Sequence, residues 1–226
     1  MVGRATKFET DGMNIAQSIS ERIADILRME IISAEIEPDA SIKQSHIAER
    51  FNVSQAPVRE ALCQLTAERF LVHQANRGVR VAPLVAAEVL ETAQLRITLE
   101  SELVAAACKR FGVEDEKNVA LALKKNAAAR TVSELLKAND AFHEALYAPA
   151  GRPITLEIVC RLRARYARYL GFMWKHSGHA AASLKEHEEL VALIRSARNA
   201  DAAKLLRKHI QASTDAILIC LKNIEP

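Results

Sequence analysis

The sequence has little of what builds β-rich, fibrous or disordered proteins. Aromatic residues make up 4% of its 226 positions, and it has only 7 glycines and 6 prolines. Few aromatic residues argue against a mainly β protein, because aromatic and β-branched side chains favour strands. Few glycines and prolines, with 50% hydrophobic residues, exclude a collagenous or low-complexity chain. We therefore expect a folded, mainly α protein.

The sequence also lacks long apolar runs and closely spaced cysteines. No stretch reaches the roughly 18 to 20 apolar residues that span a bilayer, and the first residues lack the apolar segment of a signal peptide. We therefore expect a cytoplasmic protein with no membrane partner. The wide spacing of the cysteines argues against a disulfide framework or a zinc ribbon, so reduced and mostly buried thiols are expected. The cysteines are Cys63, Cys108, Cys160 and Cys220.

The net charge is too small to indicate a nucleic-acid partner by itself. The chain carries +3, from 31 basic and 28 acidic residues. The distribution of charge is more informative, because residues 1–42 hold an acidic excess whereas bases outnumber acids between Lys43 and Arg80. This segment is locally positive.

The pattern of apolar residues over 14–84 predicts a winged helix-turn-helix, preceded by a disordered tail at 1–13. The expected elements are helices from 14 to before 38, over 44–51 and from 54 to about 68, and strands over 70–72 and 79–81. Asn52 favours a left-handed turn between the second and third helices. Ser54 is expected to cap the third helix by accepting the N–H of Ala56, and Pro57 fits the first turn.

The start of the third helix carries candidate contacts to DNA. In a helix-turn-helix, residues near the N-terminus of the second helix of the motif face base edges in the major groove. The fork of Arg59 fits guanine, Gln55 fits adenine or a phosphate, and Ser54 fits a phosphate. An isolated arginine is more often solvated or paired, here with Glu60 or Glu68. The candidates, which include the tip of the wing, are Gln44, Ser45, Ser54, Gln55, Ala56, Pro57, Arg59, Asn76, Arg77 and Gly78.

The rest of the chain predicts an antiparallel six-helix bundle. We place the boundary near 82–86, where Pro83 closes the first domain. The expected helices span 86–111, 114–129, 131–148, 152–176, 181–199 and 201–223. Short connections between them favour antiparallel neighbours.

The segment from Ile47 to Leu62 resembles the N-terminal domain of the GntR family of bacterial transcription regulators. It contains the pattern Ser-x-x-Pro-Val-Arg-Glu-Ala-Leu from Ser54 onward, and Asn-Arg-Gly-Val follows at 76–79. The resemblance implies a winged helix-turn-helix that binds an operator. Three positions depart from the family pattern. Asp39 and Arg69 stand where the family has Gly, and Gln55 stands where many members have Arg.

Patterns in the second half resemble the FadR-type branch of that family, and six helices resemble its VanR-like subgroup. The patterns are Arg96-x-x-x-Glu100, Asn139-Asp140-Ala141-Phe142-His143, Glu186-His187-Glu188 and Lys208-His209. The resemblance implies that 85–226 is a helical domain that binds a small carboxylate effector, with Arg96 as a cation for it, and dimerises. It also implies that many members hold a divalent metal by an Asp and three His from different helices.

The residues themselves carry a weaker case for a metal. Asn139 and His143 lie four apart on one helical face, and His187 and His209 lie on two later helices. Three imidazoles and an oxygen suit Zn²⁺ or Ni²⁺. A single helical histidine is more often a hydrogen-bonded core or surface group, and the resemblance favours the metal. Asn139 stands where relatives often have Asp, and Asp140 comes one residue later.

Several other side chains could serve the effector site. A run of arginines at 161, 163, 165 and 168 offers more cations, of which 161, 165 and 168 share a helical face, and we select Arg165 as the second effector-binding candidate. Tyr166, Tyr169 and Trp174 line a cavity or fill the core.

These observations predict a ligand-responsive, DNA-binding transcription regulator and not an enzyme. We expect a homodimeric repressor that a small organic acid releases from a palindromic operator. One alternative is a metal-dependent hydrolase that uses His143, His187 and His209, which would need a general base such as Glu144, Glu186, Glu188 or Glu189. Another alternative is a redox sensor based on Cys63 in the third helix.

Overall fold

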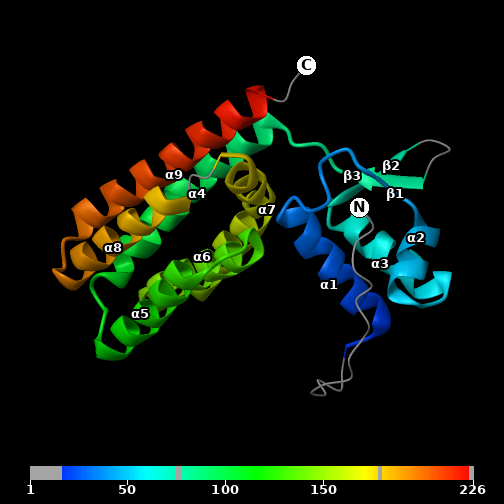
Figure 1. Cartoon of the computed structure of the whole chain (residues 1–226). Coiled ribbons are helices and arrows are strands. Elements are labelled where there is room, and N and C mark those ends of the chain that lie inside the picture. Colours follow the sequence, from blue (N-terminus) through cyan, green and yellow to red (C-terminus); the bar gives the residue numbers. More distant parts are fainter. Residues whose placement is uncertain (1–16, 75–77, 178–179, 224–226) are drawn as a thin grey trace. The chain divides into compact units, whose positions relative to one another are not determined.

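The computed structural model describes residues 17–74, 78–177 and 180–223 and divides at Leu84, so the expected tail at 1–13 lies outside the described residues. Each of the two units is compact by itself (Figure 1). The first unit contains α1 (Ile19–Ile32), β1 (Ser41–Ile42), α2 (Gln44–Phe51), α3 (Gln55–Ala67), β2 (Leu71–Gln74) and β3 (Gly78–Val81). This order confirms the predicted winged helix-turn-helix.

Helix α1 begins at a capping box. The Ser18 hydroxyl accepts the N–H of Glu21 at 3.2 Å, and the Glu21 carboxylate accepts the N–H of Ser18 at 2.7 Å. Because this box satisfies two free N–H groups, the helix starts at Ile19, later than the periodicity predicted. The side chains of Ile23, Leu27 and others then enter a core shared with α2, α3 and the sheet.

The turn before α3 is as predicted, but the cap is not. Asn52 has φ 52°, in the left-handed region, and ends α2. Ser54 occupies the N-cap position of α3, yet its hydroxyl makes no capping hydrogen bond, so the expected bond to Ala56 is wrong. The exposed hydroxyl and the first N–H groups of α3 are therefore left for solvent or a ligand.

The wing is a small antiparallel sheet in the order β1-β3-β2. Gln74 pairs with Gly78 at the end of the β2–β3 hairpin, and Gly78 has φ 86°, which favours glycine. Strand β1 was not predicted from the sequence, because two residues are too short to show a period. Leu71, Val79 and Val81 point into the core.

The second unit is helical and follows the predicted bundle. It contains α4 (Ala86–Ala107), α5 (Val113–Ala128), α6 (Val132–Tyr147), the 3₁₀ turn η1 (Ala148–Ala150), α7 (Pro153–Ser177), α8 (Ala180–Arg195) and α9 (Asn199–Lys222). The predicted helix ends shift by at most four residues. Both four-residue shifts shorten a helix: α4 ends at Ala107 and α8 at Arg195, before the left-handed Ala197 at φ 52°.

Helix α4 is the central element of this unit. It packs along α9 and against α7, and α7 and α9 also pack on each other, while α6 packs against α5 and α7 (Figure 1). Apolar residues such as Leu103, Phe142 and Ile210 are fully buried between the helices. Several charged or polar side chains are buried with them, and the site below is built from these.

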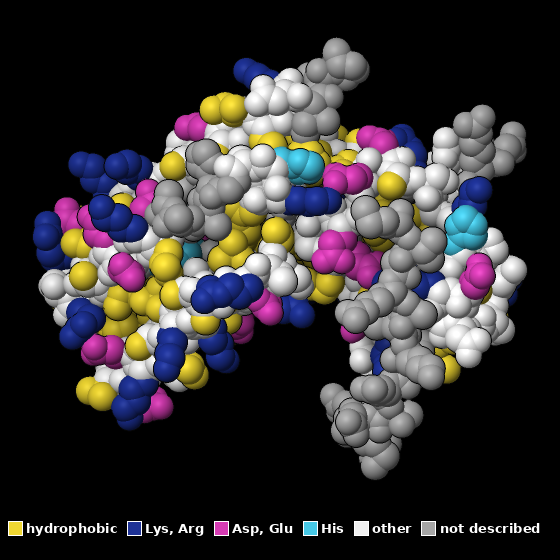
Figure 2. All heavy atoms as spheres, in the orientation of Figure 1, with side chains coloured by type: hydrophobic (Ala, Val, Ile, Leu, Met, Phe, Trp, Pro, Cys, Tyr) yellow, Lys and Arg dark blue, Asp and Glu magenta, His cyan; other side chains and the backbone are white. Residues whose placement is uncertain are grey.

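The surface of the helical unit carries mixed charge. Figure 2 shows acidic and basic side chains interspersed with hydrophobic ones on the face drawn there. No helix within the described residues combines the length and the apolar character needed to cross a membrane.

Candidate functional site

The N-terminal end of α3 presents a polar, exposed surface. Ser54, Gln55, Ala56 and Arg59 are exposed, and Pro57 is half-buried. They lie on the side of α3 opposite its buried stripe, whose members are Val58, Ala61, Leu62 and Leu65. Because the buried stripe fixes the rotation of α3, the candidate contacts face outward together.

The guanidinium of Arg59 is available for a ligand. One acid that could neutralise it, Glu68, instead forms a bidentate pair with Arg28, with both N···O distances at 2.8 Å. Within the described residues, no hydrogen bond or ion pair engages the Arg59 side chain. A free guanidinium near a helix N-terminus suits a guanine edge or a phosphate.

One further candidate, Gln44, contacts the start of α3. The Gln44 side chain donates to the carbonyl oxygen of Gln55 at 2.9 Å, which ties the start of α2 to the start of α3. Ser45 and Gly78 are exposed. Asn76 and Arg77 lie outside the described residues.

Asp39 and Arg69 stand where the family pattern has glycine, and both adopt glycine-like backbone. Their φ angles are 63° and 65°. A side chain in this region costs roughly 1 kcal/mol relative to glycine. The two departures therefore lower the stability of these turns slightly, while the backbone keeps the left-handed conformation that glycine favours.

The second unit brings three histidines together, here called the histidine cluster: His143 of α6, His187 of α8 and His209 of α9. Their candidate ligand atoms all lie within 4.8 Å of one another. All three side chains are buried, with exposures of 0%, 0% and 5%. Three imidazoles from three helices can form one face of a metal coordination shell.

The hydrogen bonds of His143 determine which of its nitrogens faces the cluster. Tyr147 donates its single hydroxyl proton to Glu100 at 2.5 Å, so its oxygen must accept from Nδ1–H of His143 at 2.9 Å. Nε2 of His143 therefore carries the lone pair, and it is buried without a hydrogen-bond partner in the structure.

The other two histidines are oriented in a similar way. Nδ1–H of His209 donates to the Glu186 carboxylate at 2.7 Å, which leaves its Nε2 as the ligand atom. Nε2 of His187 lies 3.3 Å from the Ser183 hydroxyl, and its Nδ1 is buried without a partner. Unpartnered buried nitrogens are costly, and a bound cation would satisfy them.

The electrostatics keep two of the three histidines, His143 and His187, neutral and ready to bind a cation. Burial, followed by the positive charge of Arg163, holds the pKa of His143 well below its ordinary value. Burial and the neighbouring His209 do the same for the pKa of His187. Neutral imidazole is the form that binds metals.

The structure separates the two candidate oxygen ligands. Asn139 is 4% exposed and lines the cavity beside His143 and His209. Asp140 is instead half-exposed, and its carboxylate pairs with Arg163 at 2.8 Å. Asn139 therefore lies with the histidines, and Asp140 lies on the far side of Arg163.

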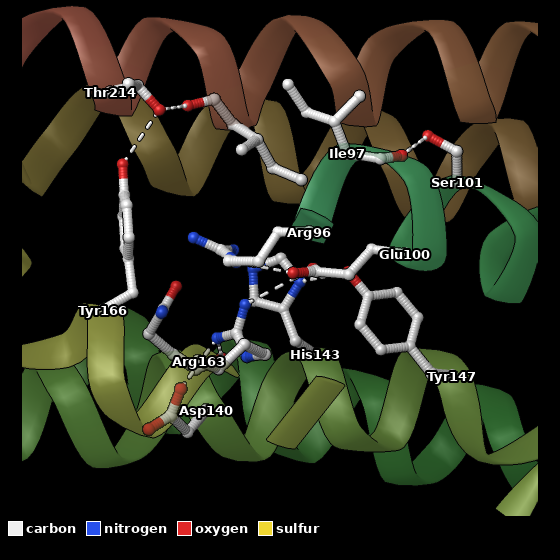
Figure 3. Close-up of polar contacts among 12 residues, drawn as sticks. Arg96, Ile97, Glu100, Ser101, Asp140, His143, Tyr147, Arg163, Tyr166 and Thr214 are labelled. Carbon is white, nitrogen blue, oxygen red and sulfur yellow. Dashed lines mark hydrogen bonds and ion pairs between the residues drawn. The ribbon is translucent and has the colours of Figure 1, made fainter. Parts of the chain in front are cut away.

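Two buried arginines share one buried carboxylate next to the cluster (Figure 3). Arg96 Nε lies 2.6 Å from Glu100, and Arg163 lies 3.6 Å from the other oxygen of the same carboxylate. Burial raises the pKa of Glu100, but the charges of both arginines, with hydrogen bonds from Arg96 and Tyr147, lower it below its ordinary value. Glu100 is thus ionised, and Arg163 has a second carboxylate partner in the half-exposed Asp140.

Tyr166 fixes the position of Arg96. Its ring lies under the Arg96 guanidinium at 4.6 Å, and its hydroxyl is 2.9 Å from the Thr214 hydroxyl. Because Thr214 donates to the Ile210 carbonyl oxygen, it accepts from Tyr166. Tyr166 and Tyr169 are thus buried and hydrogen-bonded, whereas Trp174 lines the cavity.

The free volume between these residues is small. It is about 10 Å³, close to the space one water molecule needs. Its walls include Arg96, Asn139, His143, Arg163 and His209. An ion fits this space, whereas an organic acid requires side chains to move.

Arg165 is not part of this cavity. Its side chain is 47% exposed and lies 3.5 Å from Glu88. Residues two apart on a helix point roughly 200° apart, so Arg163 faces inward where Arg165 faces outward. Arg163 belongs to the predicted run of arginines but was not selected as an effector-binding candidate, although the apolar Val159 and Tyr166, four residues before it and three after it, indicate that it shares their buried side of α7.

The carboxylates proposed as a hydrolytic base are engaged or remote. Glu186 bonds to His209, Glu144 lines a separate cavity next to Asp140, and Glu188 and Glu189 are exposed. Two of the thiols expected to be buried, Cys63 and Cys160, are exposed.

Family models match both units of the chain. The model described as "Bacterial regulatory proteins, gntR family" matches residues 19–81, and the model of the FCD domain matches residues 91–212. The chain belongs to the GntR family, in its FCD branch. This confirms the resemblance stated above for the two halves of the sequence.

Curated relatives agree with this GntR assignment. The HTH-type transcriptional repressor GlaR of Escherichia coli K12 is 31% identical over 196 residues, which cover 81% of this chain and 89% of GlaR. The Nta operon transcriptional regulator of Aminobacter aminovorans is 28% identical and covers 83% of this chain and 89% of its own.

Solved structures extend the likeness to the fold. A transcriptional regulator GntR from Rhodococcus sp. RHA1 has a TM-score of 0.74 at 25% identity, over 89% of this chain and 98% of that one. E. coli McbR/YncC, at 20% identity, has a TM-score of 0.73 over 92% of this chain and all of that one.

This GntR protein is a DNA-binding transcription regulator with an FCD effector-binding domain, and not an enzyme. Nothing in the comparisons favours the hydrolase. The exposed end of α3 is accordingly the candidate DNA surface, and the cavity of the second unit is the candidate effector site.

Proposed function

We propose that this GntR regulator is a homodimeric repressor that leaves a palindromic operator when a small carboxylate effector binds its FCD domain beside a divalent metal ion. One observation carries the proposal: the histidine cluster, with its unpartnered nitrogens, lies beside two buried arginines that share one carboxylate.

The donor set supports a divalent first-row ion. His143, His187 and His209 supply three imidazole nitrogens, and Asn139 supplies an amide oxygen. This set suits Zn²⁺ or Ni²⁺ better than Mg²⁺ or Ca²⁺, which prefer oxygen ligands. The bound ion would add positive charge to the cavity and offer open positions to an acid.

The charge balance supports a carboxylate effector. Arg96 and Arg163 are both buried and face a single buried carboxylate, Glu100, because the other partner of Arg163, Asp140, is half-exposed, so an acid that enters the cavity would meet two guanidinium groups. Guanidinium groups bind carboxylates in a bidentate way. We therefore assign Arg96 and Arg163 to the effector, in place of Arg96 and Arg165.

The exposed end of α3 supports reading of DNA bases. Arg59 and Gln55 would contact base edges, while Ser54 and the first N–H groups of α3 would contact phosphate. A homodimer would place two α3 helices about 34 Å apart, one turn of DNA, on the two halves of a palindrome.

A thermal-shift screen tests the proposal for the FCD domain. Purified protein is stripped with a chelator and melted with Zn²⁺, with Ni²⁺, with a panel of small organic acids, and with each acid plus each ion. A ligand that binds the folded state raises the melting temperature. We expect the ions to raise it alone, and at least one acid to raise it further only when an ion is present.

Two variants test whether the ion-dependent rise in melting temperature comes from the histidine cluster. We expect His187→Ala to abolish the ion-dependent shift and metal retention by elemental analysis. His176→Ala, an exposed histidine of α7, is the matched control and should keep both. If wild-type protein binds no divalent ion, or if no acid weakens its operator complex in a gel shift, the proposed function is wrong.

A further inference from the structure

A second cavity lies between α6 and α7, and we call it the α6–α7 cavity. Its free volume is about 120 Å³, whereas the cavity beside the histidine cluster has about 10 Å³. Because about 10 to 15 Å³ of such space holds one water molecule, the α6–α7 cavity has room for several non-hydrogen atoms. A small molecule therefore fits it without movement of side chains.

Part of the wall of this cavity is apolar. Val159 and Tyr147 are buried, and Leu156 is half-buried. The Tyr147 hydroxyl is already engaged by Glu100 and His143, so its ring is the part left for a ligand. These carbon atoms favour an occupant with an apolar portion of its own.

The opposite character comes from two carboxylates of α6. Asp140 and Glu144 lie four residues apart, so they share one face of the helix, and both line the cavity. Asp140 pairs with Arg163 at 2.8 Å. Glu144 is exposed, and no hydrogen bond or ion pair engages its carboxylate in the part of the chain that the structure describes. One guanidinium therefore faces two carboxylates in this cavity.

The thiol of Cys160, which also lines the cavity, reports the sign of the local potential. Burial, followed by the charge of Glu144, raises the pKa of this exposed thiol. Asp140 and Glu100 raise the same pKa further, whereas Arg163 lowers it. Three carboxylates thus act on the thiol against one guanidinium, and the resulting negative potential favours a bound cation.

Arg163 can release Asp140 to a ligand at low cost. Figure 3 shows Arg163 between Asp140 and Glu100, and its guanidinium lies 3.6 Å from the Glu100 carboxylate. If a ligand takes Asp140, the buried charge of Arg163 still has Glu100 as a partner. The large penalty of an unpaired buried charge is therefore avoided.

The cavity suits a molecular cation better than a metal ion. Within the described residues, the histidine cluster is the group in which three possible metal ligands lie within 4.8 Å of one another. Asp140, Glu144 and Cys160 form no such group. A cation with several hydrogen-bond donors and an apolar body would instead use both the carboxylates and the carbon atoms of the wall.

The geometry points to the α6–α7 cavity as a binding site for a small organic cation, of the class of protonated primary alkylamines. The ammonium group donates hydrogen bonds to Glu144 and Asp140, and the alkyl chain packs against Leu156, Val159 and the ring of Tyr147. The site is separate from the cavity beside the histidine cluster and needs no metal ion, so it goes beyond the proposed function.

Isothermal titration calorimetry of the full chain with butylammonium chloride tests the site. We expect a Kd on the order of 1 mM, which is within reach of a ligand of about five non-hydrogen atoms. The neutral 1-butanol has nearly the same size. We expect it to bind at least about tenfold more weakly, because it lacks the charge that pairs with the carboxylates.

Two variants locate the bound cation. Glu144→Gln removes one carboxylate and should raise the Kd at least about fivefold, and Cys160→Phe places a ring in the cavity and should abolish binding. Glu157→Gln is the matched control, because Glu157 is an exposed carboxylate of α7 that pairs with Arg161 at 2.5 Å and does not line the cavity. It should bind like the wild type. Circular dichroism checks that each variant is folded, which we expect because these positions are exposed.

The inference fails if wild-type protein gives no saturable heat with butylammonium, or if 1-butanol binds equally well. An unchanged Kd in either Glu144→Gln or Cys160→Phe also overturns it, because the cation then binds elsewhere. The titrations use the protein as purified and no organic acid. Binding of butylammonium without any response to acids would therefore refute the proposed function and leave the cation site standing.

Discussion

Replacing Tyr147 by Phe tests the hydrogen-bond chain that orients His143. The chain runs from the Glu100 carboxylate through the Tyr147 hydroxyl to Nδ1–H of His143. In Tyr147→Phe the imidazole loses the acceptor that holds the proton on Nδ1. The Nδ1–H tautomer, whose Nε2 lone pair faces the cluster, is then no longer fixed, and the ring can rotate within its pocket.

The expected loss follows from the role of such outer partners. Removing a hydrogen-bond partner of a metal-binding histidine typically lowers metal affinity about 10- to 100-fold. We therefore expect the Kd of Tyr147→Phe for Zn²⁺ to rise by that factor, which corresponds to a loss of about 1.4 to 2.7 kcal/mol of binding free energy. The affinity for Ni²⁺ should fall as well, because the substitution changes the orientation of the His143 side chain and not the ion.

The assay is a competition titration against a chromogenic chelator at fixed pH. Tyr169→Phe is a matched control, because Tyr169 is also buried and also donates to a carboxylate, Glu88, at 2.9 Å, but it does not contact the cluster. Both variants should lose stability from an unpaired group, about 1 to 3 kcal/mol, whereas only Tyr147→Phe should lose metal affinity. Equal zinc affinity for Tyr147→Phe and wild type would refute the argument from tautomers.

Three other perturbations test separate parts of the structure. Arg59→Ala should weaken specific operator binding by about 1 to 3 kcal/mol in gel shifts at fixed salt, with a smaller change on random DNA. Arg69→Gly should raise the free energy of unfolding by about 1 kcal/mol in urea titrations, because φ is 65° there, and Arg69→Ala should bring no gain. Burial holds the pKa values of His143 and His187 below those of the unfolded chain, so the unfolded state binds more protons. Metal-free protein should therefore lose up to about 2.7 kcal/mol of stability per pH unit below pH about 6.5, and a flat profile from pH 7 to 5 would contradict this.

The first unit could be predicted well because its signals are local. Each signal acts on the backbone conformation of a few neighbouring residues. Asn52 and Gly78 adopt positive φ in the two turns, and the apolar stripe of α3 sets which side of that helix is buried. The sequence could not show that Ser54 leaves its capping bond unmade, because that depends on a rotamer. Strand β1 forms only because β3 supplies its partner, so no local pattern marks it.

The effector cavity was predicted in part, for a reason of geometry. The three histidines were named from spacing and resemblance, and the structure does bring them together. Tyr147 and Arg163 were missed as site residues because their roles depend on neighbours from other helices, Glu100 above all. The choice of Arg165 instead of Arg163 was wrong because the two residues point to opposite sides of α7, and only Arg163 faces the cavity.

The ion pairs of Arg163 tie α7 to two neighbouring helices. Its guanidinium is buried at the cavity and pairs with Asp140 of α6 and Glu100 of α4. An acid that takes a hydrogen bond from Arg163 competes with both carboxylates. Because packed helices move as rigid elements, we expect such an acid to shift α7 relative to α4 and α6.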